Sequence, residues 1–209
     1  MPEHVLEVRG RAVGPWPMNS YVLVCPRTRQ SALVDPGADP AALQELLADT
    51  TPVAILLTHT HPDHIGALDQ MREALGVPLV MHPGPHFQDT SYAADLELAD
   101  GAEFQLGDHT LIAQYAPGHI DDQVCFKVKG EPIAIVGDTI FEGGPGRTAS
   151  ADAFRTTLTT LHNVVLPWED DTLCYPGHGP SFRLGDIRRR VEDFVARDHG
   201  GFHGDATWD

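Results

Sequence analysis

Three histidines and an aspartate lie within six consecutive residues of this chain, at His59, His61, Asp63 and His64. Neutral imidazoles and carboxylates are the usual protein ligands of zinc and similar metals. If the segment begins in an extended conformation, the side chains of His59 and His61 point to the same side. If the chain then turns into a helix after His64, Asp63 and His64 reach a neighbouring position. One short segment would thus supply ligands to two adjacent metal ions.

A single motif cannot complete two metal sites, so the remaining ligands must come from elsewhere in the chain. His119, Asp138 and His178 each lie in a polar cluster that directly follows an apolar, strand-like run. Loops at strand ends are where a rigid scaffold presents chemistry. A carboxylate such as Asp138 is suited to bridge two metals about 3.5–4 Å apart. The sequence therefore predicts a metal site assembled from several strand ends.

The chemistry expected of such a site is hydrolysis. Two metals would lower the pKa of a bound water from ~16 towards ~7 and so provide a metal-bound hydroxide nucleophile at neutral pH. They would also polarise the substrate carbonyl and stabilise the oxyanion that develops from it. Glycines at positions 118, 137 and 177, next to these side chains, permit tight turns or close backbone approach.

The elements that must position these residues come as two series of strands, each followed by helices. Asp39 is predicted to cap the first helix, with Pro40 in its first position. Residues 82–100 are expected to form a loop with a short helix. Strands are expected at 5–8, 21–24, 31–34, 53–57, 77–81, 102–106, 110–115, 123–128, 132–136 and 172–175, and helices at 40–47, 65–75, 151–162 and 186–197. This order predicts a mixed α/β domain of two halves, with the sheets packed together and the helices outside.

Length and composition narrow the partners of the protein. The 209 residues suit one domain, predicted over residues 1–198, and the Gly-rich tail 199–209 is expected to be poorly ordered. A net charge of −16 disfavours nucleic acid as a substrate. The chain has no apolar run near the ~18 residues that a membrane span needs, and its first residues do not resemble a signal segment. We therefore expect a cytoplasmic protein that acts on a small molecule, without a membrane or nucleic-acid partner. The oligomeric state stays open.

The three cysteines, Cys25, Cys125 and Cys174, each lie beside an apolar residue. Their spacing matches no metal-binding pair, and their odd number argues against a disulfide framework. They are expected to be small buried hydrophobic residues.

Taken in order, these motifs resemble the metallo-β-lactamase-fold superfamily. The matching pieces are HTHPDH at 59–64, APGH at 116–119, GDT at 137–139 and PGHG at 176–179, so the resemblance spans residues ~19–180. It implies a four-layer αββα sandwich with the site along one edge of the two sheets. It also implies two divalent metal ions, zinc in the first place, with iron and manganese as alternatives. The implied ligands are His59, His61 and His119 for the first metal, Asp63, His64 and His178 for the second, and Asp138 as the bridge.

Within that superfamily, residues 137–148, GDTIFEGGPGRT, resemble the glyoxalase II-like branch of thioester hydrolases. This implies hydrolysis of a small thioester or ester-like substrate, with Asp63 needed for turnover. Full-length glyoxalase II has a C-terminal helical domain that helps to bind glutathione, whereas only ~30 residues follow His178 here. The resemblance therefore does not extend to glutathione specificity. The alternatives are a one-iron persulfide dioxygenase, a lactonase or β-lactamase type of hydrolase, and a metal-binding module without turnover.

Five further residues have two interpretations each. Asp35 is a turn former or orients a metal ligand. Arg147 binds a substrate carboxylate or forms an ion pair. Trp16 overhangs the site or packs against the sandwich. His82 and His86 line the pocket or are solvated loop residues. The remaining histidines, at positions 4, 109, 162, 199 and 203, are expected to be ordinary surface or core residues.

Overall fold

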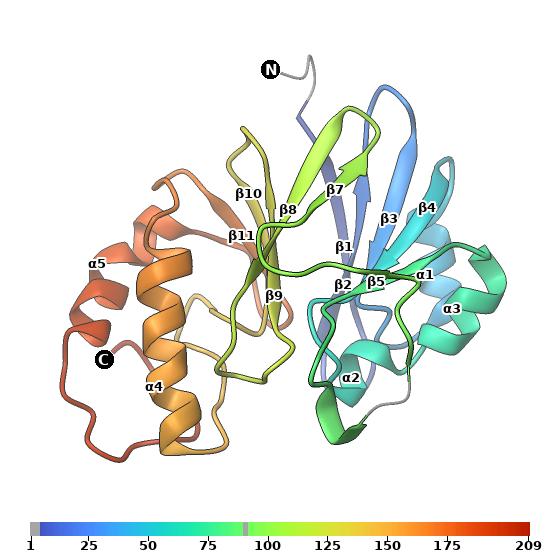
Figure 1. The fold of residues 1–209 in the computed structure, drawn as a ribbon. Coiled ribbons are helices and arrows are strands. Elements are labelled where there is room, and N and C mark those ends of the chain that lie inside the picture. The colour runs from blue at the N-terminus through green and yellow to red at the C-terminus, as the bar shows by residue number, and fades with distance from the viewer. Residues whose placement is uncertain (1–4, 90–91) are drawn as a thin grey trace.

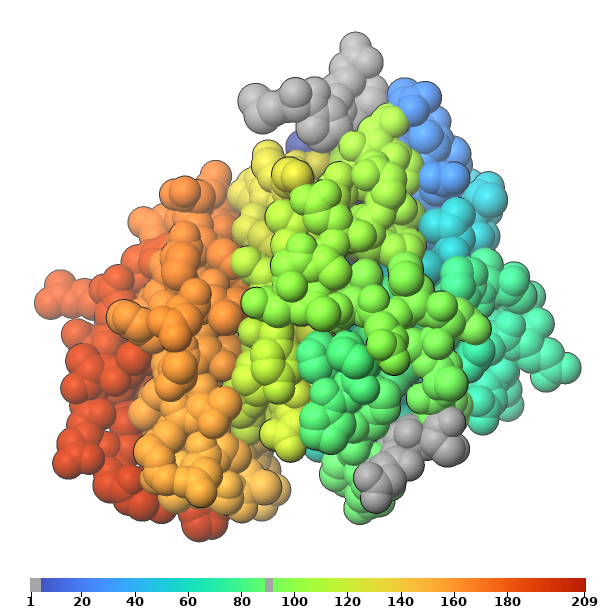
Figure 2. Space-filling model, in the orientation of Figure 1, coloured from blue at the N-terminus to red at the C-terminus, as the bar shows by residue number. Residues whose placement is uncertain are grey.

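Two six-stranded sheets pack face to face, and helices cover the outer face of each (Figure 1). The computed structural model describes residues 5–89 and 92–209. Chain order follows the layers, since the N-terminal half builds one sheet with its helices and the C-terminal half builds the other. In the space-filling view these two halves are in close contact (Figure 2). The predicted α/β architecture, a four-layer αββα sandwich, is confirmed.

The N-terminal sheet has its strands in sequential order. It contains β1 (Glu7–Val13), β2 (Met18–Val24), β3 (Gln30–Val34), β4 (Thr51–Leu56), β5 (Leu79–Met81) and β6 (Leu96–Glu97). The first three strands are antiparallel, and β3 to β6 are parallel. Parallel neighbours need crossover connections. Between β3 and β5 these are α1 (Pro40–Leu47), α2 (Pro62–Ile65) and α3 (Leu68–Leu75), and the short turn η1 (Phe87–Asp89) precedes β6.

The C-terminal sheet contains β7 (Glu103–Leu106), β8 (His109–Tyr115), β9 (Val124–Val128), β10 (Ile133–Gly137), β11 (Leu173–Pro176) and β12 (Phe182–Arg183). Neighbouring strands are antiparallel except β10 and β11, which are parallel. Helix α4 (Ala151–Thr160) continues into one π-helical turn, η2 (Leu161–Val165), and α5 (Leu184–Val195) follows β12. Because β10 and β11 run in the same direction, Asp138 and His178 emerge at the same edge of the sheet.

The central strands are buried on both faces, which explains their unbroken apolar sequences. In β10, Ile133 and Ile135 pack between the sheets, whereas Ala134 and Val136 pack under α4 and α5. Burying a side chain of this kind contributes about 1.5–3 kcal/mol. Cys25, Cys125 and Cys174 are free and buried, as predicted. Among the described residues, no helix is long and apolar enough to cross a membrane.

Several local predictions need correction. Asp39 precedes α1 as expected, but its side chain caps no helical N–H, and its Oδ2 instead accepts a hydrogen bond from the backbone N of Gly14 at 3.1 Å. The helix expected over 65–75 is divided into α2 and α3 around Gly66 and Ala67. An added Cβ on Gly66 would lie 2.4 Å from the carbonyl oxygen of Gly37, so this turn is packed tightly against the loop after β3. The two-residue strands β6 and β12 are too short to leave a periodic signal.

The expectation of a poorly ordered tail at residues 199–209 is wrong. Trp208 is only 2% exposed and belongs to the cluster under α4 and α5. Thr148 and Gly204 form an isolated antiparallel bridge, which ties the tail to the loop before α4. A Gly-rich sequence carries no periodic pattern, so the sequence showed neither anchor.

Candidate metal centre

The motif from His59 to His64 lies at the carboxyl end of β4, where the chain leaves the core. His59 and His64 are buried, and His61 is half-buried at the N-terminus of α2. His61 has extended backbone angles, φ −62° and ψ 146°, and Pro62 then occupies the first turn of α2. The expected change from an extended segment to a helix is therefore present, although it falls three residues earlier than predicted.

The motif meets residues of the other sheet at this edge. The backbone N of Val124 donates to the carbonyl of Thr58 at 2.8 Å, and the N of Asn19 donates to the carbonyl of Gly177 at 2.7 Å. These bonds join the two halves next to the histidines. The loop between β8 and β9 thereby places His119 opposite the motif.

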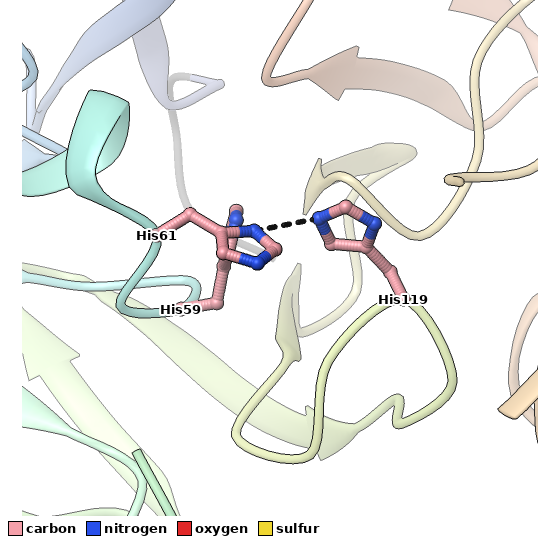
Figure 3. A group of neighbouring side chains, drawn as sticks. All are labelled: His59, His61 and His119. Carbon is pink, nitrogen blue, oxygen red and sulfur yellow. Dashed lines mark hydrogen bonds between the residues drawn. The ribbon is translucent and has the colours of Figure 1, made fainter. Parts of the chain in front are cut away.

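A first cluster consists of His59, His61 and His119, whose potential ligand atoms all lie within 4.8 Å of one another. Their rings converge from two sides of the molecule (Figure 3). His119 Nε2 lies 2.8 Å from His61 Nδ1. The carbonyl of Arg147 accepts a hydrogen bond from His119 Nδ1 at 2.8 Å, so the lone pair of this ring is on Nε2.

A second cluster contains Asp63, His64 and His178, again within 4.8 Å. His178 Nε2 lies 3.1 Å from Asp63 Oδ2, and His178 Nδ1 donates to the carbonyl of Pro17 at 3.0 Å. The Nε2 of His178 thus faces Asp63, and a metal bound there would replace this contact.

Asp138 lies between the two clusters. Its Oδ2 is 3.5 Å from His119 Nε2 and 3.6 Å from His178 Nε2, and its Oδ1 is 3.5 Å from His64 Nε2. At these separations the contacts are electrostatic approaches rather than hydrogen bonds. All seven predicted site residues therefore meet at one edge of the sandwich.

Three buried polar atoms at this edge have no hydrogen-bond partner among the described residues. They are His59 Nε2, His64 Nε2 and Asp138 Oδ1. Leaving a buried acceptor or donor unsatisfied costs about 1–3 kcal/mol. Two imidazole nitrogens and a carboxylate oxygen that face one another form a donor set for a zinc-like metal. The residues present therefore fit a metal centre.

Asp35 holds the buried side of this centre through hydrogen bonds. Its Oδ1 accepts from the Thr58 backbone N at 2.7 Å, and its Oδ2 accepts from Thr58 Oγ1 at 2.6 Å and from His64 Nδ1 at 2.9 Å. Thr58 Oγ1 is in turn 3.0 Å from His59 Nδ1. Asp35 also belongs to a third group of possible ligands with His59 and His64. Because its oxygens are already occupied, it orients these two rings instead of binding a metal itself.

The pKa values divide the histidines of the site into two groups. Burial lowers the pKa of His59 and brings that of His61 to about 4, which leaves both rings neutral at pH 7. The hydrogen bond with His178 lowers the pKa of Asp63 to about 2. Burial lowers the pKa of His64, but the contacts with Asp138 and Asp35 outweigh it and raise the pKa to about 10. A metal at its Nε2 would have to displace that proton.

Two residues pack around Asp138. Gln123 was not predicted from the sequence, whereas Gly177 was expected to allow close backbone approach. Gln123, fully buried, accepts a hydrogen bond from the Asp138 backbone N at 3.3 Å and donates to the carbonyl of Val124 at 2.9 Å. A lone polar residue at the start of an apolar strand was its only signal. At Gly177, an added Cβ would lie 2.2 Å from Asp138 Oδ1, so only glycine leaves room for that carboxylate.

The structure also gives the surroundings of the other residues that had two interpretations. Trp16 is 75% exposed, so it does not pack against the sandwich. His82 stacks on Tyr115 with ring centroids 4.6 Å apart, and His86 Nε2 donates to the carbonyl of His82 at 2.8 Å. Arg147 lines a cavity beside the clusters, and its Nε lies 3.5 Å from Asp205 Oδ2. His109 is a core residue paired with Glu131.

The sequence is similar to those of metallo-hydrolases. The sequence profile of the metallo-beta-lactamase superfamily matches residues 13–178. The probable metallo-hydrolase YqgX of Bacillus subtilis is 33% identical over 191 residues, which cover 82% of this chain and 90% of that protein. The probable hydroxyacylglutathione hydrolase glo2 of Schizosaccharomyces pombe is 29% identical over 167 residues, which cover 76% of this chain and 62% of that protein.

Solved structures agree with these sequence matches. BLEG-1, described as a B3 metallo-beta-lactamase, superimposes with a TM-score of 0.77 at 29% identity, over 88% of this chain and 97% of that chain. TTHA1623, solved in a di-iron-bound form, gives a TM-score of 0.73 at 27% identity, over 87% of this chain and 97% of that chain.

Proposed function

The chain belongs to the metallo-β-lactamase superfamily, and we propose that it is a binuclear metal-dependent hydrolase of small thioesters or ester-like substrates. One observation carries the proposal. Two groups of histidine and aspartate side chains face each other across Asp138, with three buried ligand atoms that have no hydrogen-bond partner in the described part of the chain. A metal-binding module without turnover has no need for a second group of this kind.

The proposed ligand assignment follows the two clusters of side chains and the family to which the chain belongs. His59, His61 and His119 would hold one divalent metal, and Asp63, His64 and His178 would hold the other, with Asp138 between them. Zinc suits this set of nitrogen and oxygen ligands, and iron and manganese are alternatives. TTHA1623, solved with two irons, supports a pair of metals in a related chain.

When bound, the two metals would lower the pKa of a water to about 7 and polarise the substrate carbonyl. The protein supplies orientation and charge. Asp63 is ionised at pH 7 and would accept a hydrogen bond from the attacking water. Asp35 and Thr58 fix the rings of His59 and His64, which reduces the reorganisation needed during the reaction.

The ionised state of Asp138 is compatible with a thioester substrate. Burial raises the pKa of Asp138, but its contacts with His64 and His119 outweigh burial and lower the pKa overall. This carboxylate therefore holds no proton at pH 7 that it could give to a leaving group. A thiol has a pKa near ~8.5 and leaves as a thiolate without a general acid, whereas an amine or an alkoxide needs one.

The relatives also support thioester hydrolysis, but not a specificity for glutathione. The name of glo2 describes a thioester hydrolase, but this chain spans only 62% of that protein, so its glutathione specificity is not carried over. BLEG-1 makes a β-lactam the second candidate substrate. The net charge of −16 supports a small molecule rather than a nucleic acid, and we propose that the protein acts on it in the cytoplasm.

A substrate panel tests the proposal. Protein loaded separately with zinc, manganese or iron would be assayed on acyl thioesters, a lactone, a β-lactam and a persulfide. We expect the thioesters to be hydrolysed fastest, with activity lost on chelation and restored by metal. Faster β-lactam turnover would favour the second candidate. Oxygen consumption with a persulfide would establish the dioxygenase, and metal binding without any turnover would establish a binding module.

A further inference from the structure

The candidate metal centre opens into a cavity of about 430 Å³ that is lined in part by the C-terminal segment of the chain. Asp205, Ala206 and Thr207 contribute from that segment. Phe141 and Arg147 contribute from the loop after β10, and three of the candidate ligands line the same cavity. Residues about sixty positions apart in sequence thus enclose the space where a substrate would lie next to the metals.

Trp208 fixes the segment in place. Its indole Nε1 donates to the carbonyl of Glu142 at 2.9 Å, and its backbone N donates to the carbonyl of Gly143 at 3.2 Å. Its ring packs edge to face against Phe194 of α5, with centroids 5.2 Å apart. A side chain that is 2% exposed and bonded at both nitrogens gives the neighbouring residues a defined position.

The loop after β10 is shaped to receive this segment. An added Cβ on Gly144 would lie 2.2 Å from the carbonyl oxygen of Ala206, so the two backbones are in direct contact. Thr148 and Gly204 exchange backbone hydrogen bonds of 3.1 Å and 3.0 Å at the other end of the contact. The segment is therefore built into the site.

A pair of opposite charges lies at the edge of this cavity. Arg147 Nε is 3.5 Å from Asp205 Oδ2, and the two side chains are 68% and 87% exposed. The backbone of Arg147 is held next to the centre, because its carbonyl accepts the hydrogen bond from His119 Nδ1. The guanidinium would attract a substrate carboxylate, and Asp205 opposes that attraction by neutralising the guanidinium and repelling anions.

We propose that residues 205–207 form a substrate-binding wall, held in place by Trp208, and that Asp205 determines specificity, favouring thioesters that carry no carboxylate near the reacting carbonyl. The inference rests on the proposed function, because it concerns the substrate of the same site. Asp205 acts on the charge of the substrate and takes no part in the reaction itself.

The test uses two probes that differ by one charge, the S-acetyl thioesters of mercaptoacetate and of mercaptoacetamide. The wild type should prefer the amide. Asp205→Asn should raise kcat/KM for the carboxylate probe about two- to fivefold, the range open to an exposed charge pair, and leave the amide probe within about twofold. Asp209→Asn is the matched control, since it removes a carboxylate of the same segment outside the cavity. It should leave the ratio of the two probes unchanged.

A second measurement separates this inference from the proposed function. Dissociation constants of the matching S-ethyl thioethers, measured by calorimetry on the metal-loaded protein, should show the same change of ratio without turnover. Asp205→Asn should change the ratio less in an Arg147→Gln background than in the wild type, because only the direct repulsion of the substrate carboxylate is then left to remove. If wild type hydrolyses neither thioester, the proposed function fails, and the thioether ratio still decides the role of Asp205. An equal ratio in the wild type and in Asp205→Asn would overturn the inference.

Discussion

The two halves of the sandwich contribute to the candidate centre in different ways. The N-terminal half supplies His59, His61, Asp63 and His64 from one short segment, and Asp35 holds two of these rings through buried hydrogen bonds. The C-terminal half supplies its candidate ligands singly, from three separate loops. It also supplies the residues that line the adjoining cavity, all of which lie between His119 and Thr207 in the sequence.

This difference indicates a division of labour. In the N-terminal half, the network of Asp35, Thr58 and His64 is buried and hydrogen-bonded, so substitutions there should change metal affinity and kcat. The C-terminal half adds a cavity wall beside its three candidate ligands. This wall is open and includes a segment remote in sequence, so substitutions in the wall should change KM and specificity. Substitutions chosen in matched pairs test this difference between the two halves.

The largest effect is expected for Asp63→Ala in the N-terminal half. Loss of the ionised carboxylate should reduce kcat roughly 10³-fold, the scale found when a preorganised polar group is removed from an active site. The fold should persist, because the Asp63 side chain is 31% exposed. Steady-state kinetics and circular dichroism measure the two effects. Asp121→Asn, an exposed carboxylate nearby, serves as the control, and wild-type rates in Asp63→Ala would remove this residue from the site.

Trp208→Ala should have the next largest effect, on stability. Truncating a buried tryptophan typically costs about 3–5 kcal/mol of unfolding free energy, measured here by denaturant titration. Trp16→Ala is the matched control, since Trp16 is 75% exposed and its loss should cost less than about 0.5 kcal/mol. Equal costs for the two variants would show that the tail is not anchored in the core.

Asp35→Asn should weaken metal binding about 10–100-fold without removing a ligand. An amide nitrogen in place of Oδ2 would face two donors, Thr58 Oγ1 and His64 Nδ1, and would repel both. Competition with a chromophoric chelator measures the affinity. If Asp35→Asn binds metal as tightly as the wild type, the buried network does not orient the rings.

Gly144→Ala should have the smallest effect and should spare the metals. The added methyl group would press on the Ala206 carbonyl, move the wall of the cavity and raise KM about fivefold, equivalent to about 1 kcal/mol of overpacking. Gly143→Ala is the control, because its Cβ would meet nothing within 4 Å. Changed metal affinity in Gly144→Ala would contradict the separation between the two halves.

The same contrast explains what could be predicted from the sequence. The strand pattern gave the layers because strands buried on both faces are apolar throughout, as in β10. The N-terminal part of the site was visible because its residues are contiguous, whereas His119, Asp138 and His178 became a set only through their positions after strands and the family resemblance. Their role as metal ligands stays a prediction.

Other features depended on contacts between distant residues, which no local pattern records. The hydrogen bonds of Asp35 to Thr58 and His64 cross from one strand end to another, and Gln123 supports Asp138 from a neighbouring strand. The packing of Trp208 on the loop after β10 joins residues far apart in the chain. For the same reason the tail was wrongly expected to be poorly ordered.

Metal stoichiometry tests the central claim most directly. Chelator-treated protein would receive zinc in steps while thioester hydrolysis and bound metal are measured on the same sample, the latter by elemental analysis. The account predicts two metal ions per chain and activity that rises until the second ion is bound. Full activity with a single zinc ion bound per chain would contradict it.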